Sequence, residues 1–241
     1  MEEQQQRIAT TSAPRPARPI PLPREAVEWV RVAKLGNVET LTKPDDPVTK
    51  TKAVKGITTF KGLHISSILG VFRDAKVANE WVDLLKSMKE YPYEQKQCTS
   101  ESPFVSSMST VEGDAMQDIE VINQVYAFPW PIQARDFVLL RQFNFRNETR
   151  DVEVYYESIE DSRIPVKEEY IRGTNIYSRF YFRAEGDNTY CEVETQVDLK
   201  GTLPSSVINL IQKFWPMKTL GALEKIARKG TVAPLSRVAA W

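Results

Sequence analysis

Arg141 has the most unusual setting of any charged residue in the sequence. If the segment 136–146 is a β-strand, alternate residues share one face. The face that carries Arg141 is otherwise apolar, with Phe137, Leu139, Phe143 and Phe145. A buried guanidinium without a partner costs several kcal/mol, so it must bind a carboxylate, a carbonyl, water or a ligand oxygen. The sequence leaves open whether Arg141 makes a structural ion pair, reaches solvent at a sheet edge, or holds the polar head of a ligand in a cavity.

Small and polar residues occupy predicted inward positions on the neighbouring strands. These residues are Ser158, Ser178, Cys191 and Thr195. A core packed to native density would carry larger apolar side chains at such positions. An apolar cavity with a few placed polar groups is the usual form of a small-molecule site. In the register that the alternation gives, the pattern therefore favours a cavity; a shift of one residue would exchange the two faces.

The residue types that catalysis usually requires are scarce or isolated. His64 is the only histidine, and it has no HxH or HExxH partner for a metal site. Cys98 and Cys191 are far apart, and Cys191 lies on a predicted inward face, where cysteine more often packs than reacts. The sequence contains no GxSxG, P-loop or GxGxxG motif. We therefore expect no catalytic residue, no metal site and no cofactor.

The composition is that of a globular protein with balanced charge. The chain has 241 residues, of which 41% are hydrophobic and 27% charged, enough for one sizeable core. Its 32 basic residues equal its 32 acidic residues, so no net field favours nucleic acid as a partner. Two cysteines exclude a disulfide framework. No apolar stretch is long enough to span a bilayer. We therefore expect the two cysteines to be reduced thiols in a cytoplasmic protein.

Residues 1–23 are predicted to form a proline-rich tail outside the folded domain. The segment lacks the apolar region of a secretory signal, and its prolines favour extended conformations. We expect disorder in this tail, and the alternative is that it recruits a partner that recognises proline motifs. The folded domain is expected over residues 24–230, followed by a C-terminal tail at 231–241.

The first part of the domain predicts a helix, two strands and two further helices. Residues 24–35 have apolar side chains near helical spacing. Two strand-like runs, 48–55 and 57–65, are separated by Gly56. In the segment 66–86, apolar residues recur at three- and four-residue steps, and Asp74 is the predicted cap of a second helix.

From about residue 118 to residue 199 the apolar pattern has a period of two, typical of antiparallel strands with one wet face. The clearest strands are 136–146, 176–183 and 191–199, with turns at 147–151 and 186–188. The last element is a predicted helix from about residue 203 to residue 229, which Pro216 should kink. Before Pro216, its apolar stripe consists of Val207, Leu210, Ile211, Phe214 and Trp215.

Three motifs in the sequence resemble those of one family. The run from Phe128 to Arg141, FPWPIQARDFVLLR, is similar to the proline-rich turn and RDF strand of START (steroidogenic acute regulatory-related lipid transfer) domains. The run from Asp198 to Asn209, DLKGTLPSSVIN, resembles their last strand and the start of their C-terminal helix. Trp81 follows a short predicted helix, where the family carries a tryptophan. The predicted order of elements agrees with the family over residues 24–229.

The resemblance implies an α+β helix-grip fold (START/Bet v 1-like), in which a curved antiparallel sheet surrounds a long C-terminal helix and encloses a cavity. It further implies non-catalytic binding of one lipid and its transfer between membranes, with transient contact at the membrane surface. The lipid could be a sterol, a ceramide, a phospholipid or another apolar ligand. Two alternatives remain: a cyclase-like enzyme of the wider helix-grip superfamily, and a lipid-sensing adaptor protein.

The resemblance also assigns roles to individual residues. Arg135 and Asp136 match a structural pair, and Arg141 matches the arginine that projects into the tunnel of sterol-handling members. Those members pair this arginine with an acid at the position of Ile122, from which Glu120 is one same-face step away. The loop that contains Ile164 and Pro165 matches one that faces the helix and opens for ligand entry.

Two departures from the family disfavour a choline head group. Phosphatidylcholine-binding members carry an arginine where this chain has Ala78. Of their choline-facing aromatic positions, which correspond to Gln124, Phe137 and Ile176, only one is aromatic here. The residues expected to bind the ligand are Arg141, Phe137, Leu139, Phe143, Gln124, Ile176, Ser178, Phe180, Thr195, Val207, Leu210, Ile211 and Phe214, with Ile164 and Pro165 in the gate loop.

Overall fold

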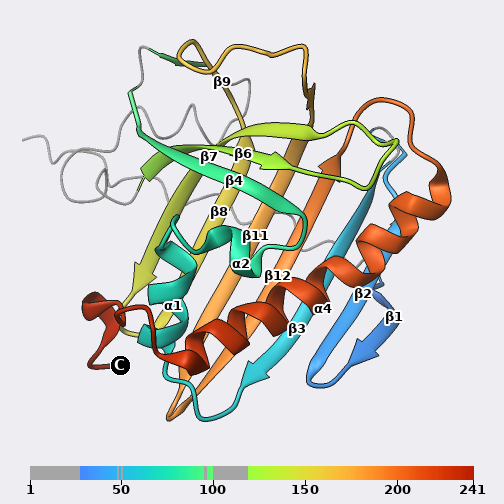
Figure 1. The fold of residues 1–241 in the computed structure, drawn as a ribbon. Helices are drawn as coiled ribbons and strands as arrows, with labels where there is room; N and C mark the ends of the chain where they lie inside the picture. Colours follow the sequence, from blue (N-terminus) through green and yellow to red (C-terminus); the bar gives the residue numbers. More distant parts are fainter. Residues whose placement is uncertain (1–27, 48, 50, 95–96, 100–118) are drawn as a thin grey trace, which may run out of the picture.

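The structure is a computed structural model that describes residues 28–47, 49, 51–94, 97–99 and 119–241 (Figure 1). The tail predicted at 1–23 lies outside these residues, so a proline-motif partner for it stays a prediction. The helices are α1 (Ile65–Arg73), α2 (Ala78–Trp81), α4 (Ser205–Lys229) and the short 3-10 helix η2 (Ser236–Val238). The strands are β1 (Val30–Leu35), β2 (Val38–Asp45), β3 (Lys52–Phe60), β4 (Leu85–Pro92), β5 (Cys98–Thr99), β6 (Ile119–Tyr126), β7 (Arg135–Arg146), β8 (Asp151–Ser158), β9 (Glu160–Asp161), β10 (Ile171–Arg172), β11 (Thr174–Glu185) and β12 (Asn188–Asp198).

Within the part of the chain that the structure describes, ten strands form one mostly antiparallel sheet. The strand order is β1-β2-β3-β12-β11-β8-β7-β6-β4, and β10 pairs with β7 in parallel. The first three strands join the later ones through β3 and β12, where Val54 is opposite Thr195. Figure 1 shows the long helix α4, together with α1 and α2, on one face of this sheet. This arrangement confirms the expected α+β helix-grip fold.

The face of the sheet under the helices carries the main core. Phe72 of α1 lies at its centre, with ring centroids 4.9 Å from Phe180 and 5.1 Å from Phe182. Leu220 and Leu223 of α4 belong to the same buried cluster. Each such side chain contributes about 1.5–3 kcal/mol when it leaves water. The predicted strands at 136–146, 176–183 and 191–199 are confirmed as parts of β7, β11 and β12.

The opposite face of β7 is not wet, which corrects the expectation of one solvated face for this strand. Val138 and Leu140 are fully buried there in a second cluster with Val121, Ile159 and Ile164. The last two residues come from the segment that follows β8. The outer face of β7 is therefore covered by the chain that leaves the sheet after β8.

The predicted helix at 24–35 is wrong over the described residues, because 30–35 form the edge strand β1. This strand pairs with β2, with Val30 opposite Thr42, and leaves Val30 and Leu35 largely exposed. A few apolar residues near helical spacing do not distinguish a short helix from a short strand. Residues 30–35 form a strand because their backbone pairs with β2.

Gly56 does not separate two strands, because β3 runs through it from Lys52 to Phe60. A Cβ at this position would lie 2.7 Å from the Cβ of Pro216 and 3.0 Å from Cγ1 of Val193. The glycine therefore allows α4 to pack directly against the sheet. The helix continues through Pro216 as one element.

The predicted helical segment at 66–86 contains two short helices and the approach to β4. Asp74 ends α1, with its N–H donating to the carbonyl of Val71, and does not cap α2, which begins after Val77. His64 caps α1, because its ring Nδ1 accepts from the N–H of Ser66 at 3.3 Å. This histidine therefore has a structural role.

The segment expected as a C-terminal tail, 231–241, packs against α1. Leu235 donates its N–H to the carbonyl of Ser66 at 2.8 Å, and Val238 is fully buried. A Cβ on Gly70 of α1 would collide with the carbonyl oxygen of Ala233. The C-terminal segment is thus part of the folded unit.

Candidate functional site

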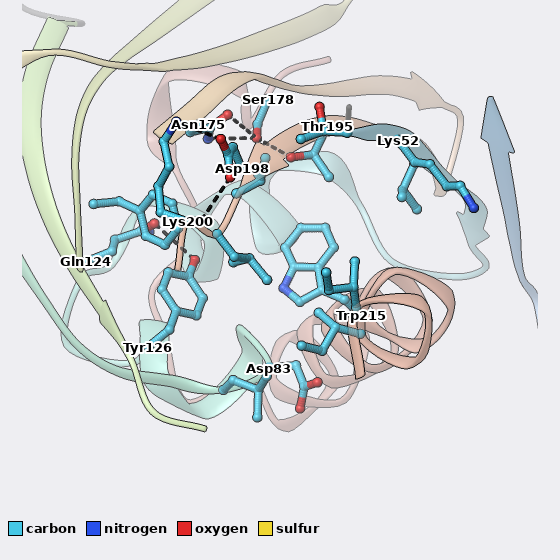
Figure 2. A pocket seen from close by; sticks show the side chains of 18 of the residues that line it. Lys52, Asp83, Gln124, Tyr126, Asn175, Ser178, Thr195, Asp198, Lys200 and Trp215 are labelled. Carbon is cyan, nitrogen blue, oxygen red and sulfur yellow. Dashed lines mark hydrogen bonds and ion pairs between the residues drawn. The ribbon is translucent and has the colours of Figure 1, made fainter. Parts of the chain in front are cut away.

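A cavity of about 550 Å³ lies between the sheet and the first half of α4. Its volume falls within the range of roughly 300–1,000 Å³ that is usual for small-molecule sites. From α4, Ile208, Asn209, Ile211 and Trp215 line it, and the three apolar positions share one side of a helix. Figure 2 shows Asn175, Ser178 and Thr195 grouped on one wall, and Gln124 with Tyr126 on another. The walls are mainly apolar, and further polar and charged side chains line the cavity from β2, β3, β12 and the segments that follow α2 and β12.

A row of paired residues crosses the sheet beneath the cavity. Thr195 is opposite Ser178, Ser178 is opposite Tyr156, and Tyr156 is opposite Arg141. Directly opposite residues share a face, so Arg141 lies on the inner face, as its alternation with Leu139 and Phe143 predicts. The first three of these residues line the cavity, and Arg141 lies beyond its wall.

Arg141 is held by two carboxylates from the last strands of the sheet. Its side chain is 1% exposed. Its Nη2 lies 2.8 Å from Glu120 of β6 and 2.5 Å from Glu90 of β4. Burial alone would lower the pKa of this guanidinium, but Tyr156 and the two carboxylates raise it above its usual value. The geometry corresponds to the structural ion pair that the sequence left open, not to a guanidinium at the cavity wall.

Three polar side chains of β11 and β12 bind one another at the wall. Nδ2 of Asn175 donates to Oγ of Ser178 at 2.9 Å, and the hydroxyls of Ser178 and Thr195 are 2.6 Å apart. The backbone N–H of Asn175 also donates to Oγ of Ser158, at 2.8 Å. These contacts satisfy polar groups that burial would otherwise penalise.

A bulge in β11 brings Asn175 to this cluster. The pairing with β12 shifts by one residue between Asn175 and Tyr177. The shift places Asn175, rather than Ile176, at the cavity wall with Ser178. Ile176, which was expected to bind the ligand, therefore does not line the cavity, because strict alternation fails at the bulge.

Gln124 and Tyr126 form a second polar point on β6. The Tyr126 hydroxyl donates to Oε1 of Gln124 at 3.0 Å. Burial raises the pKa of Tyr126 above its usual value. On β8, burial raises the pKa of Tyr156 to about 12. Both phenols are therefore neutral near physiological pH.

The charged residues that line the cavity are each paired with an opposite charge. Lys200 lies 2.7 Å from Asp198, and Lys52 lies 3.9 Å from Asp45. Asp83 is paired with Lys218 of α4 at 3.4 Å. All are at least partly exposed, so these pairs contribute little to stability. They do, however, neutralise the charge that a ligand would meet.

The structure brings seven of the predicted binding residues to the cavity: Gln124, Phe137, Leu139, Ser178, Phe180, Thr195 and Ile211. Val207 and Phe214 are not among the lining residues, because Ile208, Ile211 and Trp215 are the side of α4 that faces the cavity. Phe143 belongs to the core instead, with its ring 6.3 Å from that of Phe72. The side chain of Leu210 lies outside the described residues.

The loop predicted as a gate does not lie at the cavity. Ile164 is buried in the second cluster on the outer face of the sheet, and neither Ile164 nor Pro165 lines the cavity. The carbonyls of both accept hydrogen bonds from Arg172, which also binds Asp136 at 2.8 Å. These bonds join the loop to β7 and β10. A gate at Ile164 and Pro165 stays a prediction.

Several lining residues were missed by the sequence analysis. Trp81 lies in the segment that was predicted only as helical, and Tyr126 lies in a strand whose bounds were not predicted. Neither was expected to line the cavity, and both do. Tyr156 could have been found, because the strand period predicts its face once β8 is placed next to β11. Asn175 could not, since the sequence carries no signal for the bulge.

His64 and Cys191 lie away from the cavity lining. The Nε2 of His64 lies 3.0 Å from the carbonyl of Trp241. Cys191 is fully buried in the core, and burial raises the pKa of its thiol. Among the described residues, no group of three or more His, Cys, Asp and Glu side chains could hold a metal ion. In the same residues, no helix is long and apolar enough to cross a membrane.

An antiparallel sheet that packs a long C-terminal helix over a mainly apolar cavity defines a ligand-binding domain of the helix-grip class. The model of the START domain matches residues 24–214 of this chain. The chain therefore belongs to the START domain family, as its motifs indicate.

Solved structures of this family have the same fold. Human STARD10 superposes with a TM-score of 0.68 and 16% identity, covering 86% of this chain and 75% of that one. Human StAR-related lipid transfer protein 5 also has a TM-score of 0.68, with 14% identity over 86% of this chain and 89% of its own. StAR-related lipid transfer protein 7, mitochondrial, of Mus musculus is 27% identical over 79 residues, which is 33% of this chain and 21% of the relative.

Proposed function

We propose that this START domain binds one lipid in its cavity and transfers it between membranes without changing it chemically. The observation that carries the proposal is the cavity of about 550 Å³, with mainly apolar walls and polar side chains among them. Membership of the START family and the names of the relatives, which are lipid transfer proteins, support the same function. Each buried CH₂ of a lipid contributes about 0.8 kcal/mol, so an acyl chain or sterol skeleton supplies most of the affinity.

The polar groups at the cavity favour binding over acid–base chemistry. Tyr126 and Tyr156 have raised pKa values and are protonated near neutral pH. The carboxylates of Asp83 and Asp198 are held by lysines. A cyclase-like enzyme would need a general base with a pKa near the working pH. We therefore prefer a carrier to an enzyme.

Replacing Leu139 with tryptophan is expected to fill the cavity and to reduce lipid binding by at least tenfold. Leu139 is buried and lines the cavity from β7, so a larger side chain can extend into the space that a ligand would occupy. Native mass spectrometry after incubation with a mixed lipid extract would measure the bound lipid. The wild-type protein should show one discrete adduct, and the variant should show little or none.

The matched control is Leu35→Trp, the same replacement at an exposed position of the edge strand β1. This variant should bind lipid as the wild type does. Equal lipid occupancy in the Leu139→Trp variant would place the ligand elsewhere. A wild-type protein without any adduct would contradict lipid binding itself.

We also propose that the loop between β6 and β7 contacts the membrane during transfer. Trp130 in this loop is 92% exposed, which is unusual for a tryptophan, and Phe128 of the same loop lines the cavity. Tryptophan is favoured at the membrane–water interface. Gln133 of the same loop donates a 3.1 Å hydrogen bond to the carbonyl of Glu168, in a second loop whose Val166 is 68% exposed.

The variant Trp130→Ser is expected to slow lipid transfer between vesicles about fivefold while it leaves the bound lipid at equilibrium unchanged. The reason is that Trp130 would stabilise only the membrane-bound state, since its side chain lies outside the cavity lining. A transfer assay between labelled donor and acceptor vesicles measures the rate. Leu35→Ser, which removes another exposed apolar side chain, should have no such effect. An unchanged rate for Trp130→Ser would exclude this loop as the contact.

A further inference from the structure

Trp81 presents a buried hydrogen-bond donor that has no acceptor among the described residues. Its side chain lines the cavity and is 5% exposed. The indole ring packs at 5.2 Å from that of Phe72, and its Nε1 is buried without a hydrogen-bond partner. Leaving such a donor unpaired costs about 1–3 kcal/mol. A tryptophan in this position is therefore better explained if an acceptor reaches it from the cavity.

Gln124 supplies a second donor that is only weakly used. Its Oε1 accepts the Tyr126 hydroxyl, and its Nε2 has the sulfur of Met88 at 3.5 Å as its partner. The thioether sulfur of Met88 accepts hydrogen bonds weakly and cannot donate one. The Gln124 amide is therefore oriented with its Nε2 toward this sulfur and its Oε1 toward the Tyr126 hydroxyl. The Nε2 group can therefore donate more strongly to an oxygen in the cavity.

The charges around the cavity offer no free partner for a charged head group. In the described chain, the lining residues Lys52, Lys200 and Asp83 each have an opposite charge within 3.9 Å. Arg141 is neutralised by Glu90 and Glu120, outside the lining. A phosphate or ammonium that entered the cavity would lose its hydration without gaining an unpaired counter-charge.

The size of the cavity limits the apolar part of the ligand. At ~30 Å³ for a water-sized group, a volume of about 550 Å³ holds roughly 18 such groups. This is room for one acyl chain or for most of a sterol skeleton. The volume therefore favours a ligand with one chain or one ring skeleton.

We propose that the cavity selects an uncharged lipid with one chain or a sterol-sized skeleton, whose oxygen accepts a hydrogen bond from Nε1 of Trp81. Gln124 is the second donor available to such a ligand. This inference rests on the proposed function and deepens it, because it names the class of lipid and the side chain that recognises it.

The first experiment compares lipids that differ in charge. The purified full chain is incubated with phosphatidylcholine vesicles that contain equal amounts of cholesterol, monooleoylglycerol and oleoyl lysophosphatidate. Native mass spectrometry then identifies the bound lipid by its mass. We expect cholesterol or monooleoylglycerol to be bound at least tenfold more than lysophosphatidate, which shares its chain and glycerol with the neutral probe, and more than phosphatidylcholine.

The second experiment tests the donor. Trp81→Phe removes the indole N–H and keeps an aromatic ring in the core, and we expect it to weaken binding of the preferred neutral lipid about 3- to 10-fold. Trp29→Phe is the matched control, because the ring of Trp29 contacts the side chains of Lys43 and Lys55 and does not line the cavity. Its affinity should stay within twofold of the wild type. The thermal midpoint of each variant reports whether the fold is retained.

The outcomes separate this inference from the proposed function. Stronger binding of lysophosphatidate or phosphatidylcholine would overturn the inference and leave lipid binding in place. Equal affinities of the Trp81→Phe variant and the wild type would exclude the tryptophan as the recognising group. If none of the four lipids binds, the proposed function itself fails.

Discussion

The variant Arg141→Leu is expected to lower the free energy of unfolding by about 3 kcal/mol. Removing the guanidinium leaves the carboxylates of Glu90 and Glu120 without their counter-charge. The two negative charges then repel each other next to an apolar side chain. Removing one partner of a fully buried ion pair costs about 3–5 kcal/mol of stability. We place the effect at the lower end because the side chains of Glu90 and Glu120 are 36% and 22% exposed. Urea unfolding followed by circular dichroism would measure the change.

Neutralising the partners provides the control for this prediction. The triple variant Arg141→Leu, Glu90→Gln, Glu120→Gln removes the uncompensated carboxylates, so it should recover much of the lost stability. Lipid occupancy of the folded fraction should remain near that of the wild type, since Arg141 lies outside the cavity lining. A stable Arg141→Leu variant that has lost its lipid would instead make Arg141 a ligand contact.

The second large effect is expected at the contact between α4 and the sheet. The variant Gly56→Val should destabilise the protein by about 3 kcal/mol, because even a Cβ would come within 2.7 Å of Pro216 and 3.2 Å of Leu220. The Cβ of Pro216 belongs to a rigid ring and Leu220 is fully buried, so α4 must shift away from β3. The same shift would enlarge or distort the cavity beneath the helix, so lipid affinity should also fall. Thermal unfolding and native mass spectrometry measure the two effects.

Gly221 of the same helix offers a matched control with the opposite sign. A Cβ at this exposed position would meet no atom within 4 Å. Gly221→Ala should therefore stabilise the protein by about 0.5–1 kcal/mol through helix propensity alone. A Gly56→Val variant as stable as the wild type would show that the helix does not depend on this close approach.

Much of the sheet could be predicted, because its strands obey a simple period. Alternation predicted β7, β11 and β12, and charged or glycine-containing segments predicted the turns between them. The same period gave the correct face for Leu139, Ser178 and Thr195. The motifs at Phe128–Arg141 and Asp198–Asn209 then indicated the family and hence the helix over the sheet.

The remaining features depend on contacts between distant parts of the chain. The bulge at Ile176 and the close packing at Gly56 leave no periodic signal, since each is a property of two elements in contact. The role of Arg141 was undecided because Glu90 lies on an edge strand that the sequence analysis did not place next to β6. The side of α4 that faces the cavity also depends on how the helix packs on the sheet. It could therefore be predicted only to within about one residue.

The pairing of β3 with β12 has a consequence for how the protein is made. Lys55 and Glu192, which form a hydrogen bond across this pair, are 137 positions apart in the chain. Closing so long a loop is entropically costly, and sheets rich in distant pairings fold slowly, on the scale of milliseconds to seconds. During synthesis, β1 to β3 leave the ribosome long before β12 and α4 exist. The cavity is thus completed only when the C-terminal residues have emerged, and the first lipid can be enclosed only after that.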